Sequence, residues 1–318
     1  MKRGFFYTIT VFVFLIALFI LFVIIGSRNA LEEQQGTTSR VRTMNAFLEQ
    51  LEEDSKRAAF ISGVHTLIAL EQQIVDTGNF LATPEDDFRE IFLTGALDNR
   101  SFDIMENSTF THYLDRVQLI ADRTGILIDV NVTNVTIRQN DPWNVLIEYT
   151  LEENMTDTSG VASWVDDTRI SVKIPITSVK DPLFSVFTLS RITHIIKQTN
   201  VSQFVDDTGD ANDSTGLQQF FNESEYTANP NAPSFFMRLQ GNLSASPHGI
   251  ESFIDAVEFD NQGLTVTITR SHVDWLYFGS TISDDICNIQ TMPGTFKLDT
   301  EHLDTYQING TLNYTTCI

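Results

Sequence analysis

The chain has 318 residues and a formal net charge of −22 at pH 7, from 42 acidic and 20 basic side chains. This excess of negative charge repels phosphate backbones and anionic headgroups, so it excludes nucleic acid as a partner. Aspartate outnumbers glutamate and lysine is scarce, a balance that suits solubility in high salt, where screening removes self-repulsion. The composition predicts either a halophilic source or an ordinary acidic surface protein.

An apolar segment at residues 5–25 follows the basic start of the chain. At about 1.5 Å per residue, a helix of this length spans the roughly 30 Å hydrocarbon core of a bilayer. Lipid offers the backbone no hydrogen-bond partners, so the segment must be helical there. We predict a transmembrane helix over residues 5–26 in contact with the lipid bilayer. The basic residues before it indicate a cytoplasmic N-terminus and a chain that lies mostly outside the cell.

The first six residues resemble a class III signal peptide. The basic pair and Gly4 before Phe5 are similar to the leader of type IV prepilins, archaeal ones in particular, whereas Ile9 stands where bacterial prepilins have a glutamate. The resemblance implies that a prepilin peptidase cuts between Gly4 and Phe5. Residues 1–4 would then be the leader, and the apolar helix would stay in the mature protein. The alternative is an uncleaved signal anchor.

Residues 27–80 carry the pattern of a long amphipathic helix that continues the membrane segment. Apolar side chains recur mainly at steps of three and four between residues 44 and 74, with charged side chains between them. Gly36 and the two threonines after it favour a weak point or a break. We therefore predict a helical stalk over residues 27–80.

Residues 81–205 predict an α+β extracellular domain, in which an antiparallel-sheet head carries packed helices. Alternation of apolar and polar residues indicates strands that are covered on one face, and Pro84 with the acidic residues after it suits a first helical turn. Helices are expected at residues 84–97, 109–123 and 181–197, and strands at residues 126–138, 143–152 and 168–176.

Residues 206–318 form the predicted C-terminal extracellular region, which begins with an acidic segment at residues 206–216. This segment is rich in oxygen ligands for calcium, but Phe221 stands where a calcium loop needs a glutamate, which favours a solvated loop. Arg238 lies in an apolar segment and binds either an acidic ligand or, as we favour, a structural carboxylate. The aromatic residues at 275–278 either stack on glycans or, as we favour, pack in the core.

Five segments of the chain resemble uncharacterised archaeal surface proteins that have prepilin-like starts. These segments are residues 174–176, 181–183, 234–242, 249–252 and 273–278. The resemblance implies a location on the cell surface and no particular activity.

Modification signals are dense in the predicted exterior part of the chain. Asn-x-Ser/Thr sequons indicate a glycoprotein. Ten of them begin at Asn107, Asn131, Asn134, Asn154, Asn200, Asn212, Asn222, Asn242, Asn309 and Asn313. The chain has two cysteines, Cys287 and Cys317, which most simply form a disulfide outside the cell; two free buried thiols are the alternative.

Motifs for bond chemistry are absent from the sequence. The six histidines are scattered, no zinc-binding helix motif or phosphate-binding loop occurs, and the two cysteines are too few and too far apart for a zinc site. We therefore expect no cofactor, no metal and no enzyme activity. The sequence favours a single-pass archaeal cell-surface protein that is pilin-like, a minor pilin or pseudopilin-type subunit that assembles with itself or with other pilin-like subunits. The alternative is a monomeric, membrane-tethered adhesin or ligand-binding ectodomain.

Overall fold

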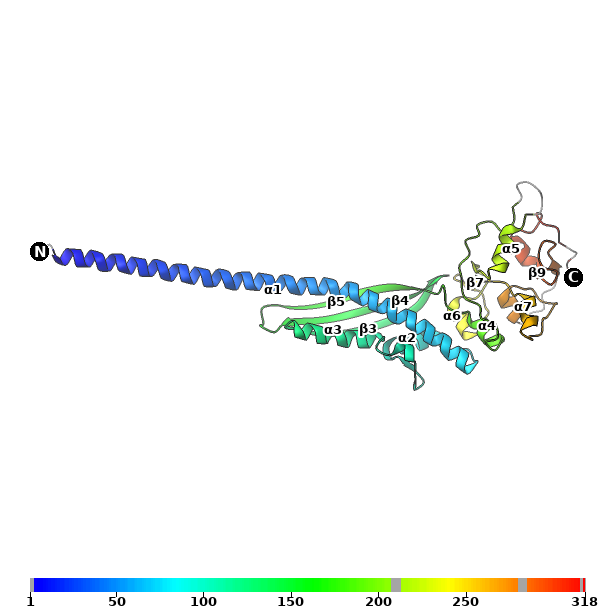
Figure 1. Ribbon diagram of the computed structural model, residues 1–318, viewed down its shortest axis with the longest axis horizontal. Coiled ribbons are helices and arrows are strands. Elements are labelled where there is room, and N and C mark those ends of the chain that lie inside the picture. Colours follow the sequence, from blue (N-terminus) through cyan, green and yellow to red (C-terminus); the bar gives the residue numbers. More distant parts are fainter. Residues whose placement is uncertain (1–2, 207–212, 280–284, 315–316, 318) are drawn as a thin grey trace. The chain divides into compact units, whose positions relative to one another are not determined.

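The computed structural model describes residues 3–206, 213–279, 285–314 and 317. Its elements in chain order are α1 (Arg3–Thr77), α2 (Pro84–Thr94), β1 (Ala96–Leu97), β2 (Arg100–Ser101), η1 (Asp103–Met105), α3 (Phe110–Arg123), β3 (Ile126–Asp141), β4 (Asn144–Asp157), β5 (Ser163–Pro175), α4 (Pro182–Phe187), α5 (Thr215–Asn222), β6 (Thr227–Ala228), α6 (Phe235–Gln240), β7 (Ile250–Glu251), α7 (Ala256–Asn261), α8 (Asp274–Phe278), β8 (Ile286–Asn288), β9 (Lys297–Asp299) and α9 (Thr300–Thr305). The protein is a mixed α+β structure with a long N-terminal helix, as predicted (Figure 1).

The largest sheet has the strand order β3-β4-β5, so the three predicted strands do lie side by side. The connection between β3 and β4 is two residues long, which only an antiparallel hairpin allows. The remaining strands form small antiparallel pairs, β1-β2, β6-β7 and β8-β9. The predicted antiparallel sheet is therefore present, with longer strands than the alternation in the sequence indicated.

Helix α1 runs without interruption over 75 residues. The break expected at Gly36 does not form, because a glycine costs only about 1 kcal/mol in a helix whose propagation gains a hydrogen bond at each residue. The helix ends at Thr77, where Gly78 has a left-handed φ of 66° and donates its N–H to the Ile74 carbonyl at 2.8 Å. A glycine with a left-handed φ commonly ends a helix in this way.

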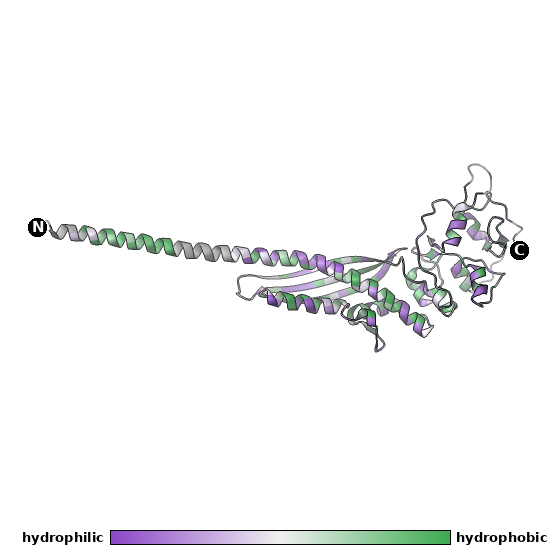
Figure 2. Ribbon diagram, in the orientation of Figure 1, coloured by the Kyte–Doolittle hydropathy of each residue, from purple (hydrophilic) through white to green (hydrophobic). Residues whose placement is uncertain are grey.

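Two stretches of α1 differ in how their side chains are covered. The large apolar side chains from Ile9 to Ile25 are all exposed, and Figure 2 shows this stretch as predominantly apolar. By length and composition, Thr37–Thr77 is long and apolar enough to cross a membrane, and Ile9–Ile25 is a shorter apolar helix. In the most apolar window of Thr37–Thr77, 44% of the residues are buried inside the protein. The later stretch therefore has protein partners, whereas the earlier one presents apolar side chains outward.

The chain divides into two compact units, each built from separate segments. The first unit comprises Met1–Ser55, Arg116–Asn131 and Leu151–Thr168, and the second comprises Lys56–Asp115, Val132–Thr150 and Arg169–Ile318. Each unit therefore contains part of α1 and part of the β3-β4-β5 sheet.

In the first unit, α1 packs on the ends of the strands. The buried core consists of Met44, Ala121, Ile126 and Met155, with Phe47, Leu48, Ile128, Ala162 and Trp164 against it. Arg40 adds a polar contact, since its Nε donates to Asp157 Oδ1 at 2.5 Å and its Nη2 donates to the Gly125 carbonyl at 3.1 Å. The amphipathic face predicted for the stalk thus packs in a core.

In the second unit, α1 approaches the sheet closely at Gly63. A Cβ atom there would lie 2.8 Å from Ile174 Cγ1 and 3.0 Å from Ile147 Cδ1, so only glycine fits without a shift of these side chains. Two further cores fill the C-terminal part of this unit. One is centred on Phe220, Phe253 and Tyr306, and the other includes Tyr277 and Phe278, which confirms that these two aromatic residues belong to the core.

A disulfide joins Cys287 and Cys317, whose Cα atoms are 4.2 Å apart. Cys287 lies on β8 and is fully buried. The bond fastens the end of the chain to the core around Phe253 and Tyr306, because that core also includes Cys287 and has Cys317 packed against it. The pair that the sequence favoured is thus bonded in the structure.

The helix expected over residues 181–197 is wrong beyond its first turns. Helix α4 ends at Phe187, and Leu189 and Ser190 have positive φ values of 54° and 56°. The following segment is extended, with Ile196 N–H donating to the Val179 carbonyl at 2.8 Å. Its β-branched residues favour this conformation, and pairing with residues 178–181 outweighs the weak local helix signal.

Candidate functional site

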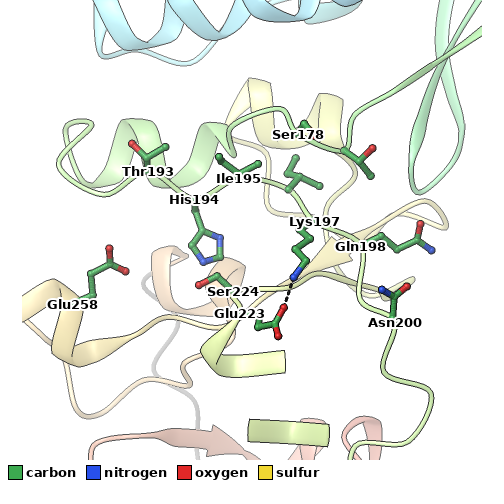
Figure 3. A pocket seen from close by; sticks show the side chains of 12 residues that line it. Ser178, Thr193, His194, Ile195, Lys197, Gln198, Asn200, Glu223, Ser224 and Glu258 are labelled. Carbon is green, nitrogen blue, oxygen red and sulfur yellow. Dashed lines mark hydrogen bonds and ion pairs between the residues drawn. The ribbon is translucent and has the colours of Figure 1, made fainter. Parts of the chain in front are cut away.

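The second unit contains a pocket of about 740 Å³ (Figure 3). The extended segment after α4 forms one wall, the residues after α5 form another, and α7 contributes Glu258. The lining residues are Thr177, Ser178, Thr193, His194, Ile195, Ile196, Lys197, Gln198, Asn200, Glu223, Ser224 and Glu258. Most of these side chains are polar, so the pocket suits a hydrophilic ligand.

His194 is held in the pocket wall by a chain of hydrogen bonds. Its Nδ1 lies 2.7 Å from the Tyr226 hydroxyl, and that hydroxyl donates to Asp181 Oδ2 at 2.7 Å. Because the Tyr226 proton goes to Asp181, the hydroxyl must accept from His194, which fixes the Nδ1–H tautomer. Nε2 then carries a lone pair, and it has no hydrogen-bond partner among the described residues.

The imidazole of His194 is neutral. Only 5% of the residue is exposed, and its ring stacks on Phe184 with centroids 4.0 Å apart. Burial lowers the pKa of His194 to about 4; Asp181 acts in the opposite direction, and Arg238 lowers it further. At neutral pH the pocket therefore presents an uncharged hydrogen-bond acceptor at this position.

Arg238 lies behind this chain of hydrogen bonds and is fully buried. Its Nη1 donates to Asp181 Oδ2 at 2.5 Å and to Asp274 Oδ2 at 2.8 Å, and its Nη2 donates to the Ile250 carbonyl. Burial would lower the pKa of Arg238, but the two carboxylates outweigh that effect and raise it. The favoured interpretation of Arg238 as a structural ion pair is confirmed.

A second buried polar cluster surrounds Glu251, which is fully buried on β7. His302 Nδ1 lies 2.7 Å from Asp299 Oδ1, and its Nε2 lies 3.4 Å from Glu251 Oε2. The Tyr306 hydroxyl donates to Glu251 Oε1 at 2.7 Å, and Asn229 Nδ2 donates to Glu251 Oε2 at 2.8 Å. Every oxygen of this buried carboxylate therefore has a donor.

His302 is the positively charged member of this cluster. Burial lowers the pKa of His302, but the contacts with Asp299 and Glu251 outweigh it and raise the pKa to about 10. The imidazolium is therefore positive at neutral pH and sits between two carboxylates. Sequence analysis missed this cluster, because only the spacing of Asp299 and His302 at a helix start hints at it, and Glu251 comes from a distant segment.

The rim of the pocket carries more negative than positive charge. Lys197 forms ion pairs with Glu223 and, at 3.1 Å, with Glu225. These contacts raise the pKa of Lys197. Burial and the neighbouring Asp255 raise the pKa of Glu258, whose carboxylate has no partner among the described residues. The one lysine that lines the pocket is thus neutralised, and Glu258 is open to a ligand.

Ser224 also lines the pocket, with a left-handed φ of 50°. In the described part of the chain its hydroxyl forms no hydrogen bond with His194. The two side chains therefore do not form, in this structure, the contact between nucleophile and base that a serine hydrolase uses.

The predicted modification sites lie mostly on the surface. The asparagines of nine sequons are exposed, and Asn200 among them lines the pocket. These are Asn107, Asn131, Asn134, Asn154, Asn200, Asn222, Asn242, Asn309 and Asn313. Asn212 lies outside the described residues, as does most of the acidic segment at 206–216.

The predicted processing site lies at the start of α1, where the backbone of Gly4 and Phe5 is helical.

Among the described residues, no group of three or more His, Cys, Asp or Glu side chains is placed to hold a metal ion. The structure brings His194, Lys197 and Glu258 to one pocket. The sequence did not predict this arrangement.

Comparison of the chain with family models, with curated proteins and with solved structures finds no match. The geometry of the site and of α1 therefore carries the functional argument.

Proposed function

We propose that this chain is a single-pass, membrane-anchored archaeal cell-surface protein with a pilin-like design, either a minor pilin or a pseudopilin-type assembly subunit. One observation carries the proposal: α1 presents exposed apolar side chains from Ile9 to Ile25 and then continues, unbroken, into a stretch packed on an antiparallel sheet. A helix that is apolar on all sides suits lipid or like helices, whereas one apolar face suits a protein core.

The role would be mechanical, with no bond chemistry. The apolar stretch would anchor the chain in the bilayer with its N-terminus in the cytoplasm, after a prepilin peptidase removed residues 1–4. The folded part would project outward, with glycans on exposed sequons. If subunits polymerise, identical contacts repeated from one copy to the next would build a helical filament.

The state of the N-terminus tests this proposal. The full chain would be recovered from native membranes and examined by intact mass and N-terminal peptide sequencing. A mature chain that begins at Phe5 supports prepilin processing, and a Gly4→Leu variant should then keep its leader. A chain that retains Met1 contradicts the pilin-like design and leaves a plain membrane-tethered protein.

A second candidate function is a monomeric tethered ligand-binding ectodomain, which the polar pocket around His194 favours. Filaments of high molecular mass in sheared cell-surface fractions would support polymerisation. Their absence, together with membrane retention of the monomer, would support the tethered binder.

A further inference from the structure

The pocket around His194 offers a ligand two open acceptors. One is the Nε2 lone pair of His194, whose tautomer the contacts with Tyr226 and Asp181 fix. The other is the carboxylate of Glu258, and Figure 3 shows Glu258 on one side of His194 and the Lys197–Glu223 pair on the other. Both groups lack partners among the described residues, so the ligand has to bring the donors.

The charge of the lining favours a cation over an anion. Glu223 and Glu258 are acidic, His194 is neutral, and the ammonium of Lys197 is engaged by Glu223 and Glu225. An anionic ligand would meet two carboxylates and no free positive group in the lining. A cation near Glu258 would offset the burial of that carboxylate.

Nitrogen-borne donors fit these acceptors better than a bare metal ion does. A metal ion generally takes several protein ligands, and the described residues provide no such cluster. An ammonium or guanidinium group carries both positive charge and several N–H donors, which are what an acidic acceptor and a neutral acceptor respectively favour.

We propose that this pocket is a binding site for a small organic cation that bears a primary ammonium or a guanidinium group. Glu258 supplies the charge, and His194 supplies an acceptor of fixed orientation. Tyr226, Asp181 and Arg238 act as positioning residues, because they hold the imidazole without touching the ligand. The inference is independent of the pilin-like assembly, since it concerns residues of the second unit alone.

The test uses the full chain in nanodiscs and titrates n-butylammonium and methylguanidinium, with n-butanol, glucose and acetate as controls. Binding is followed by saturation-transfer NMR. We expect both cations to bind. Glu258→Gln should weaken their binding about tenfold, which corresponds to the loss of one charge-assisted hydrogen bond. Glu301→Gln, which changes an exposed glutamate of α9 outside the pocket, is the matched control and should bind as the wild type does.

His194→Phe preserves the ring stack on Phe184 and removes the Nε2 acceptor, so it should also weaken the binding of both cations. If this variant does not fold, the comparison of Glu258→Gln with Glu301→Gln still decides. Absence of cation binding at 50 mM overturns the proposal. Equal affinity in the two glutamate variants overturns it as well, and so does glucose binding as tightly as the cations, which would indicate a saccharide site.

Discussion

Two buried groups, one in each compact unit, show opposite ways of accommodating buried charge. In the second unit, Arg238 is fully buried and contacts two carboxylates and a carbonyl. In the first unit, Glu153 on β4 is only 5% exposed, and its Oε1 has no hydrogen-bond partner among the described residues. Burial, with the nearby Asp166 and Glu52, raises the pKa of Glu153 to about 7.

Arg238 and Glu153 meet the same physical cost in two ways. A charge removed from water is either paired or neutralised by a shift of its pKa. Arg238 in the second unit is paired through residues from distant segments. Glu153 in the first unit gains or loses its proton near neutral pH, so the stability of the fold should depend on pH in that range.

The largest expected effect is from Arg238→Ala. This change leaves Asp181 and Asp274 buried without their cation, and it should reduce the free energy of unfolding by about 3–5 kcal/mol. Arg89→Ala is the control, because Arg89 forms an exposed pair with Asp86 on α2, and it should cost about 0.5 kcal/mol or less. Urea denaturation of both variants measures the two values. Similar losses in both variants would contradict the interpretation that burial makes the Arg238 contacts important.

A smaller effect is expected from His302→Gln, which removes the positive charge between Glu251 and Asp299. We expect a loss of about 2–3 kcal/mol at pH 7, close to that for other buried charged groups that lose a partner.

The pH dependence of stability tests the same contacts of His302 with Glu251 and Asp299. The folded pKa of about 10 lies above the ordinary value of 6.5, so the stabilisation is complete below pH 6.5 and is lost as the pH rises toward 10. The free energy of unfolding should fall over this range in the wild type and change much less in His302→Gln. Equal slopes in the two proteins would show that His302 is not charged in the fold.

A third prediction concerns His272, a buried group of the second unit that is neutral rather than paired. Both ring nitrogens lack partners among the described residues, and burial with Lys297 lowers its pKa to about 4. The folded protein therefore resists protonation, and this contribution to stability is lost as the pH falls from 6.5 toward 4.

His272→Phe has no proton to gain, so it should avoid this loss of stability at low pH and be more stable than the wild type by about 1–2 kcal/mol at pH 5. Thermal unfolding at pH 5 and pH 8 measures the change. A variant that is destabilised equally at both pH values would show that the imidazole acts only through its shape.

The smallest effect is expected from Glu153→Gln in the first unit. The raised pKa of about 7 means that the wild-type fold is most stable with a neutral carboxyl, and that stability falls as the pH rises from 4.5 through 7. A neutral amide of similar shape should add about 1 kcal/mol at pH 8 and clearly less at pH 5, where most of the loss has not yet occurred. Glu152→Gln, an exposed neighbour on the same strand, is the control. A gain at pH 5 as large as that at pH 8 would contradict the pKa argument.

Local patterns in the sequence were enough to predict the elements that local rules govern. The apolar run and the three- and four-residue steps predicted α1, Pro84 with its acidic neighbours predicted the start of α2, and the alternation of residues predicted β3, β4 and β5. Each of these signals lies within one short window of the chain, so no knowledge of distant residues is needed.

The pocket and the buried polar network arise from long-range packing, which no local pattern of residues predicts. Asp181, His194, Tyr226 and Arg238 come from segments with no common periodicity, and long-range packing alone brings them within hydrogen-bond distance. The same packing ends α4 at Phe187, because residues after it pair with an extended segment. Chemical environment depends on which residues meet in space, and local propensity is too weak to determine that.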